Sequence, residues 1–157
     1  MICELRWMKF EFTCSPLARL VALWQNGISS RRCDVKQCQV IKGGEGFHGK
    51  QGLDYFSGVS AQSTGSDGIC MHILVMPPGA KAKPHYHENH ETAIYMMEGV
   101  SEFHHGPNLE FTSRVEQGDY VYIPAGVPHQ PYNPSDKPAK ALIARTDPNE
   151  QESVVLI

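Results

Sequence analysis

From residue 39 to residue 157, short apolar segments alternate with turns rich in glycine and proline, and this pattern limits the possible folds more than any other feature of the sequence. About ten segments of strand length are separated by turn signals every ~8–12 residues. None of them carries a sustained helical pattern, in which apolar residues recur about every 3.6 positions. The sequence therefore predicts an all-β domain, either a sandwich or a barrel, and the periodicity alone does not distinguish the two.

The first 38 residues differ from the rest of the chain in charge and in cysteine content. They hold six Lys or Arg and three Asp or Glu, whereas residues 39–157 hold eight and fourteen. Four of the five cysteines also lie in this segment. The contrast predicts that residues 1–38 form an N-terminal extension, disordered or with one short helix, and that the β domain spans residues 39–157.

Composition argues against several classes of partner and location. The formal net charge of −3 argues against a nucleic acid as the main partner. No stretch approaches the ~20 apolar residues of a transmembrane helix, so we expect no membrane insertion. Five cysteines, an odd number, occur without a recognisable secretion signal, which predicts reduced thiols and a cytoplasmic location.

The most informative stretch for chemistry is residues 79–99, which contains His85, His87 and Glu91. His85 and His87 are two positions apart, and on a strand this spacing puts both imidazoles on one face with Cα atoms about 6.6 Å apart. Glu91 follows His87 by four positions, so it points the same way if the strand continues or resumes after a bulge. We therefore predict these three side chains as ligands of one metal ion.

A fourth predicted ligand, His129, follows a predicted strand at residues 120–123 and a turn at residues 124–128. Proline fixes φ and glycine permits positive φ, so this turn can reverse the chain sharply and aim His129 at the same ion. Imidazole suits Fe, Ni, Cu and Zn, and carboxylate suits Mn, so we expect one divalent transition metal ion from this group. Four protein ligands leave positions for water or substrate on an octahedral ion.

These two stretches resemble the two conserved motifs of the cupin superfamily. In this sequence they read Gly79-x5-His85-x-His87-x3-Glu91 and Gly118-x5-Pro124-x-Gly126-x2-His129-x3-Asn133. The second agrees with the family pattern at every fixed position. The resemblance implies a small jelly-roll barrel, also called a double-stranded β-helix, with the metal inside it near one mouth. It implies the same four ligands: His85, His87, Glu91 and His129.

The first motif departs from the family pattern between its acidic residue and its closing glycine. The pattern has six residues there, whereas seven separate Glu91 from Gly99. Either a one-residue bulge within residues 88–92 keeps Glu91 on the ion, or the register moves to Thr92 and the carboxylate is lost. We favour Glu91, because a carboxylate beside two histidines has a ready role. The predicted inward positions are then Ala93, Tyr95, Met97, Val121 and Ile123.

The other histidines carry weaker signals. His90 stands at an odd offset from His87, so a regular strand would turn it toward solvent. His104 and His105 adjoin a predicted turn, and we expect both to be exposed. His72 lies inside an apolar strand, where a histidine is usually a hydrogen-bonded core residue.

The expected function is that of a metal-binding single-domain protein acting on a small organic molecule. Oxygenase, decarboxylase and isomerase chemistry are all compatible with the resemblance, because one scaffold hosts many reactions. The predicted pocket lining is apolar and offers no second carboxylate or lysine beside the ion, which favours dioxygenase-type chemistry. The alternatives are a non-catalytic, metal-dependent binding or sensor module, and a barrel whose metal only braces the fold.

Self-association is also expected. The run at residues 154–157 is short and apolar, and such a segment at a sheet edge tends to be paired or covered. Members of the cupin superfamily commonly dimerise through a sheet face. We therefore predict a homodimer.

Overall fold

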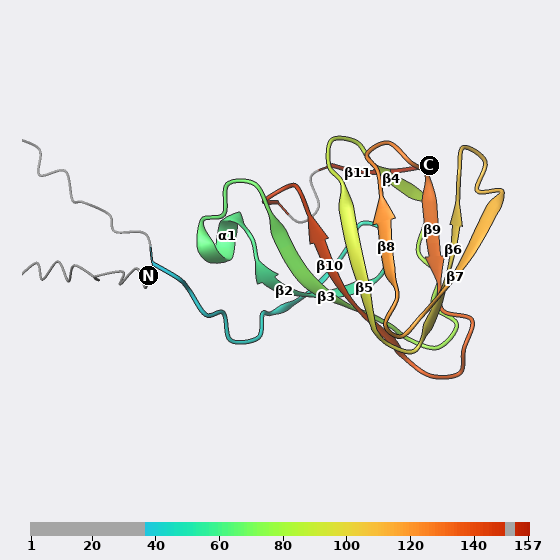
Figure 1. The fold of residues 1–157 in the computed structure, drawn as a ribbon, viewed down its shortest axis with the longest axis horizontal. Helices are drawn as coiled ribbons and strands as arrows, with labels where there is room; N and C mark the ends of the chain where they lie inside the picture. The colour runs from blue at the N-terminus through green and yellow to red at the C-terminus, as the bar shows by residue number, and fades with distance from the viewer. Residues whose placement is uncertain (1–36, 150–152) are drawn as a thin grey trace, which may run out of the picture. The chain divides into compact units, whose positions relative to one another are not determined.

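A computed structural model describes residues 37–149 and 153–157, and in them two antiparallel sheets face each other (Figure 1). In spatial order, the six-stranded sheet consists of β1 (Gly46–His48), β2 (Asp54–Val59), β3 (Cys70–Met76), β10 (Ala139–Arg145), β5 (Thr92–Glu98) and β8 (Tyr120–Ile123). The five-stranded sheet consists of β11 (Val154–Leu156), β4 (His85–His87), β9 (His129–Tyr132), β6 (Val100–His105) and β7 (Phe111–Glu116). This is the double-stranded β-helix that the sequence predicted.

One core lies between the two sheets. Along β3 and β10 every second side chain is buried, as the two-residue period of a strand requires. The inward side chains from both sheets form a single apolar cluster that includes Leu74, Met96, Phe103 and Ile143. Apolar burial of this kind is the main favourable term in folding, and here it also encloses the space in which the histidines lie.

The observed strands follow the apolar segments closely, with two exceptions. The apolar segments at residues 92–98 and 120–123 form β5 and β8, whereas the apolar pair at residues 40–41 forms no strand, and β1 lies instead in the glycine-rich stretch that follows. The short segment 59–61 ends β2 and enters the one-turn helix α1 (Ala61–Thr64). Ser60 caps this helix by accepting a hydrogen bond from the Ser63 amide, and capping of this kind overrides weak strand propensity.

The outward face of the six-stranded sheet is unusually apolar. Pairing across five strands aligns one row of side chains: Phe56, Ile73, Leu142, Tyr95 and Tyr120. The next row includes an exposed Asp54 and a half-buried Lys140, so charges of both signs border the apolar row. An apolar row across a whole sheet face is typical of a surface that another protein covers.

The site-bearing strands are neighbours in the smaller sheet. Strand β4 lies between β11 and β9, and His85 stands directly opposite His129. Most of the predicted N-terminal extension, residues 1–38, falls outside the described part of the chain. Within the described residues, no helix is long and apolar enough to cross a membrane.

Candidate metal centre

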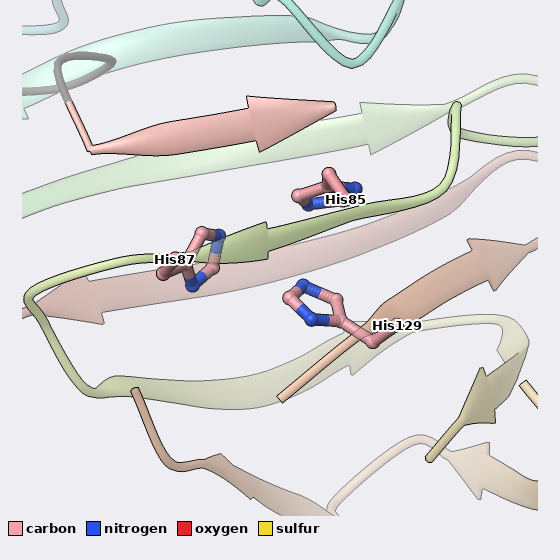
Figure 2. Close-up of side chains that lie close together, drawn as sticks. All are labelled: His85, His87 and His129. Atoms are coloured by element: carbon pink, nitrogen blue, oxygen red, sulfur yellow. The ribbon is translucent and has the colours of Figure 1, made fainter. Parts of the chain in front are cut away.

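Three histidines from two adjacent strands point into the barrel at one place. His85 and His87 come from β4 and His129 begins β9, and each is at most 3% exposed. One ring nitrogen from each residue lies within 4.8 Å of the others. Figure 2 shows the three rings turned toward a common space. The structure thus brings together the three histidines that the two sequence motifs singled out.

Hydrogen bonds fix which nitrogen of each ring faces that space. His85 Nδ1 lies 2.8 Å from the Lys83 carbonyl oxygen, and His129 Nδ1 lies 2.9 Å from the Val127 carbonyl oxygen. A carbonyl oxygen can only accept, so each Nδ1 carries the hydrogen and each Nε2 carries a lone pair. His87 Nδ1 lies 2.8 Å from the Thr92 hydroxyl oxygen, a group that can donate or accept, and its Nε2 is the nitrogen left without a partner.

The residues present therefore fit a bound metal ion. The Nε2 atom of His87 is buried and has no hydrogen-bond partner among the described residues. A buried, unpaired nitrogen of this kind costs free energy unless an ion or a water binds it. Metal-binding histidines generally donate their second ring N–H to an oxygen, and all three of these rings have such an oxygen.

The electrostatic setting keeps the three rings neutral. Burial lowers the pKa of His85 to about 4 and that of His129 to about 3. The pKa of His87 is lowered still further by burial, then by the positive charge of Arg145. Neutral imidazole is the form that binds metal ions, so the site is ready for a cation at neutral pH.

The structure does not bring Glu91 into this group. Its side chain is exposed, and its Oε1 accepts a hydrogen bond of 2.6 Å from the Tyr122 hydroxyl. Thr92, 1% exposed, takes the inward position and meets His87. The reason is the extra residue in the first motif: β5 begins at Thr92, whose partner on β8 is Ile123. Of the two registers considered from the sequence, the one that loses the carboxylate is formed.

This register also corrects the predicted pocket lining. Ala93, Tyr95 and Met97 lie on the outer face of β5, and the buried residues of that strand are Thr92, Ile94 and Met96. A one-residue slip exchanges the two faces of a strand, so one wrong residue displaces the whole set. On β8 the expectation holds better, since Ile123 is buried and Val121 packs against the core.

His90 was predicted to face solvent, but it is only 2% exposed. Its ring stacks on that of His87, with ring centroids 4.4 Å apart and an interplanar angle of 23°. Its Nδ1 lies 2.7 Å from Ser153 Oγ, which donates a 2.5 Å hydrogen bond to Asp147 Oδ2. The extra residue was the available signal, because the irregular link that turns Glu91 outward turns its neighbour inward. No motif pointed to Asp147 or Ser153.

The remaining histidines divide between core and surface. His72 is 1% exposed and lies in the core, as expected, but neither of its ring nitrogens has a hydrogen-bond partner among the described residues. Its ring instead meets Tyr55 edge-on, with centroids 5.1 Å apart. His104 and His105 were predicted to be exposed and are half-buried, each bonded to a hydroxyl of β7, from Thr112 and Ser113.

Two cavities adjoin the histidine cluster. The inner one, of about 30 Å³, lies inside the barrel beside the three rings and is also bordered by Tyr55 and Arg145. The outer one, of about 240 Å³, shares Phe103, Ile123 and His129 with it. Its remaining walls come from His105, Ser113, Val121, Tyr122, Pro124 and Val127. In the described part of the chain, neither lining includes an aspartate, a glutamate or a lysine.

The fold and this cluster together define the class: a jelly-roll barrel with a buried cluster of three histidines in its interior. Residues 72–145 match the cupin domain family. This part of the chain, which bears the three histidines, is therefore similar to that family, as the two motifs indicated. No curated protein matches the sequence.

Solved structures share this fold at low sequence identity. One is an uncharacterised protein with a double-stranded β-helix domain from Klebsiella pneumoniae subsp. pneumoniae MGH 78578 (18% identity, 58% of this chain and 76% of that one, TM-score 0.52). Another is the polyketide cyclase RemF from Streptomyces resistomycificus (22%, 78% and 85%, TM-score 0.59). A third is the oxalate decarboxylase of Lactobacillus farciminis (18%, 72% and 33%, TM-score 0.61), of which this chain spans about a third. At these identities the likeness concerns the fold alone.

Proposed function

We propose that this protein binds one divalent transition metal ion, Fe, Mn, Ni, Cu or Zn, through His85, His87 and His129. The observation that carries the proposal is the convergence of three ring nitrogens within 4.8 Å in a buried place. Each Nδ1 is held by an oxygen, which leaves Nε2 for the ion. Three protein ligands leave coordination positions open for water or a substrate.

We further propose that a small organic molecule lies in the outer cavity. The inner cavity has room for about one or two water-sized groups, so only the reacting end of a ligand can enter it. The outer cavity is larger, at about 240 Å³, and its walls are mainly apolar with a few polar groups. This mixture suits a small molecule with an apolar body and one polar edge.

The reaction that this lining favours is dioxygenase-type chemistry. When bound, the metal would act as a Lewis acid or, if redox-active, would support oxygen chemistry. No carboxylate or lysine among the described lining residues stands ready as a general acid or base. Phe103 and Ile123 border both cavities and would keep water from the reacting end of the ligand. Decarboxylase and isomerase chemistry remain alternatives, and two of the structurally similar proteins are a decarboxylase and a cyclase.

The second candidate is a non-catalytic, metal-dependent binding or sensor module. The same lack of a carboxylate or lysine among the described lining residues favours it. The two candidates differ in the fate of the ligand: a sensor releases it unchanged after long incubation with metal-loaded protein, whereas an enzyme converts it.

Elemental analysis tests the metal site directly. Wild type should carry close to one equivalent of metal after loading, and a His85→Ala/His129→Ala double variant should carry none. His104→Ala is the matched control, because His104 lies outside the cluster, on the far side of β6 from the core, and should leave the metal content unchanged. A wild type that cannot be loaded with any of the five metals would refute the proposal.

Oxygen uptake then tests the reaction. Iron-loaded protein is mixed with a panel of catechols and diketones in an oxygen electrode, with the double variant as the blank. Consumption of oxygen by wild type alone supports a dioxygenase. Metal-loaded protein that binds a member of the panel but consumes no oxygen and returns the compound unchanged supports the sensor.

A further inference from the structure

His90 is held in one protonation arrangement by the groups behind it. Asp147 accepts the single hydroxyl proton of Ser153, because a carboxylate has no proton to give. Ser153 Oγ must therefore accept a hydrogen bond from His90 Nδ1, 2.7 Å away. Burial alone would raise the pKa of Asp147, but the hydrogen bonds from Ser153 and from the Asn149 amide lower it, so the carboxylate is ionised.

This arrangement leaves the Nε2 atom of His90 with a lone pair and nothing to bind. Nε2 is buried and has no hydrogen-bond partner among the described residues. The ring lies against that of His87, a member of the cluster, with centroids 4.4 Å apart. An oxygen at Nδ1 with a carboxylate behind it is the usual support of a metal-binding histidine, and here it supports a ring that stands beside the cluster.

The first motif has also lost its acidic ligand. Glu91 points outward to Tyr122, and Thr92 uses its hydroxyl to hold His87. Among the residues that the structure describes, the three-histidine cluster therefore has no fourth protein donor, while an unsatisfied imidazole stands next to it. The same irregular link between β4 and β5 produces both facts.

We propose that His90 is the fourth protein ligand of the metal centre and replaces the carboxylate of the family motif. The inference rests on the proposed metal-binding function. His90 is not among the rings whose nitrogens lie within 4.8 Å of one another, so its ring must shift toward the ion when the metal binds. The hydrogen bond to Ser153 can serve as the pivot of this shift, since rotation of the ring about it moves Nε2 while Nδ1 stays bonded.

Proton NMR of the cobalt(II)-loaded protein tests the proposal by counting ligands. Each coordinated ring with a hydrogen-bonded Nδ1–H gives one exchangeable, strongly shifted signal. The acceptors on Lys83, Val127, Thr92 and Ser153 would protect these protons from exchange. Wild type should show four such signals, His90→Gln three, and Glu91→Gln four. Glu91→Gln is the matched control, because it alters the neighbouring residue that the family motif would have assigned.

Cobalt affinity gives a second, independent readout. His90→Gln should weaken Co²⁺ binding by more than about tenfold, since loss of even an outer hydrogen-bond partner has an effect of that size. Glu91→Gln should change it by less than about twofold, because the carboxylate is exposed and outside the cluster.

The outcomes separate this inference from the function on which it rests. Three shifted signals in wild type, unchanged in His90→Gln, would overturn the role of His90 and leave the three-histidine site standing. Failure of wild type to bind Co²⁺ at all would overturn both. The wild-type count needs no variant, so a His90→Gln protein that does not fold still leaves the test decisive.

Discussion

The hydrogen bond between Thr92 and His87 offers a test of how the cluster is held. Thr92→Val keeps the shape of the side chain but removes the hydroxyl oxygen 2.8 Å from His87 Nδ1. Both residues are at most 2% exposed, so bulk water does not replace the lost partner. An unsatisfied buried ring nitrogen costs about 1–3 kcal/mol, and we expect the free energy of unfolding to fall by that amount.

The matched control is Thr112→Val on β7. Its hydroxyl makes the same kind of contact, 3.1 Å from Nδ1 of His104, but this pair is accessible to water. Substitution there should change the free energy of unfolding by less than about 0.5 kcal/mol. Urea denaturation of both variants without added metal gives the two values directly.

Metal binding provides the second measurement for Thr92→Val. Loss of the oxygen that orients a ligand typically weakens metal affinity by about 10–100-fold. A competition titration with a chromophoric chelator measures this change. If Thr92→Val matched Thr112→Val in both stability and metal affinity, Thr92 would have no part in positioning His87, and the reading of the hydrogen bonds around the cluster would be wrong.

Three further predictions follow from other parts of the molecule. Burial lowers the pKa of His72 to about 3, so below pH ~6.5 the unfolded chain takes up a proton that the folded protein does not. The free energy of unfolding is therefore undiminished by His72 above that pH and falls on acidification, by about 2 kcal/mol at pH 5 from this residue alone. His72→Phe should flatten this pH dependence in urea titrations, and an unchanged slope would contradict the role of His72. We propose that a second copy of the chain covers the apolar row on the six-stranded sheet, because the bordering Asp54 and Lys140 can pair across a two-fold axis. Wild type should have the mass of a dimer in light scattering and Leu142→Glu that of a monomer, and a monomeric wild type would refute the interface. Val121→Phe should fill part of the outer cavity and weaken binding of 4-nitrocatechol by the iron-loaded protein at least about tenfold without changing its metal content; equal affinity would place the ligand elsewhere.

The amino-acid sequence predicted the fold and most of the cluster for identifiable reasons. Turn residues and apolar segments mark strands locally, so β5 and β8 have the limits expected from the sequence. The spacing of His85 and His87 puts them on one face of any strand, whatever surrounds it. Only one long-range event, the pairing of β4 with β9, was then needed to bring His129 opposite His85.

The fourth ligand position of the metal centre could not be predicted from the sequence in this way. Residues 88–91 lie between two strands, where no period dictates which side chains point inward. The outcome depends on where β5 begins to pair with its neighbours β8 and β10, and that pairing places Thr92 opposite Ile123 and Arg145. Glu91 is thereby left outside and His90 is enclosed, the reverse of the interpretation from strand parity.

The sequence by itself thus determined an all-β, cupin-like barrel and three histidines that meet, because both depend on local spacing and on two short motifs. The tertiary structure alone decided the partners of those histidines. Ser153 reaches His90 because β11 pairs with β4, and Asp147 reaches it because β10 pairs with β5. Both residues are far from His90 along the chain, and a hydrogen bond across 63 residues leaves no trace in local sequence. The choice between Glu91 and Thr92 was likewise made by sheet pairing, since a one-residue slip reverses the faces of a strand at little local cost.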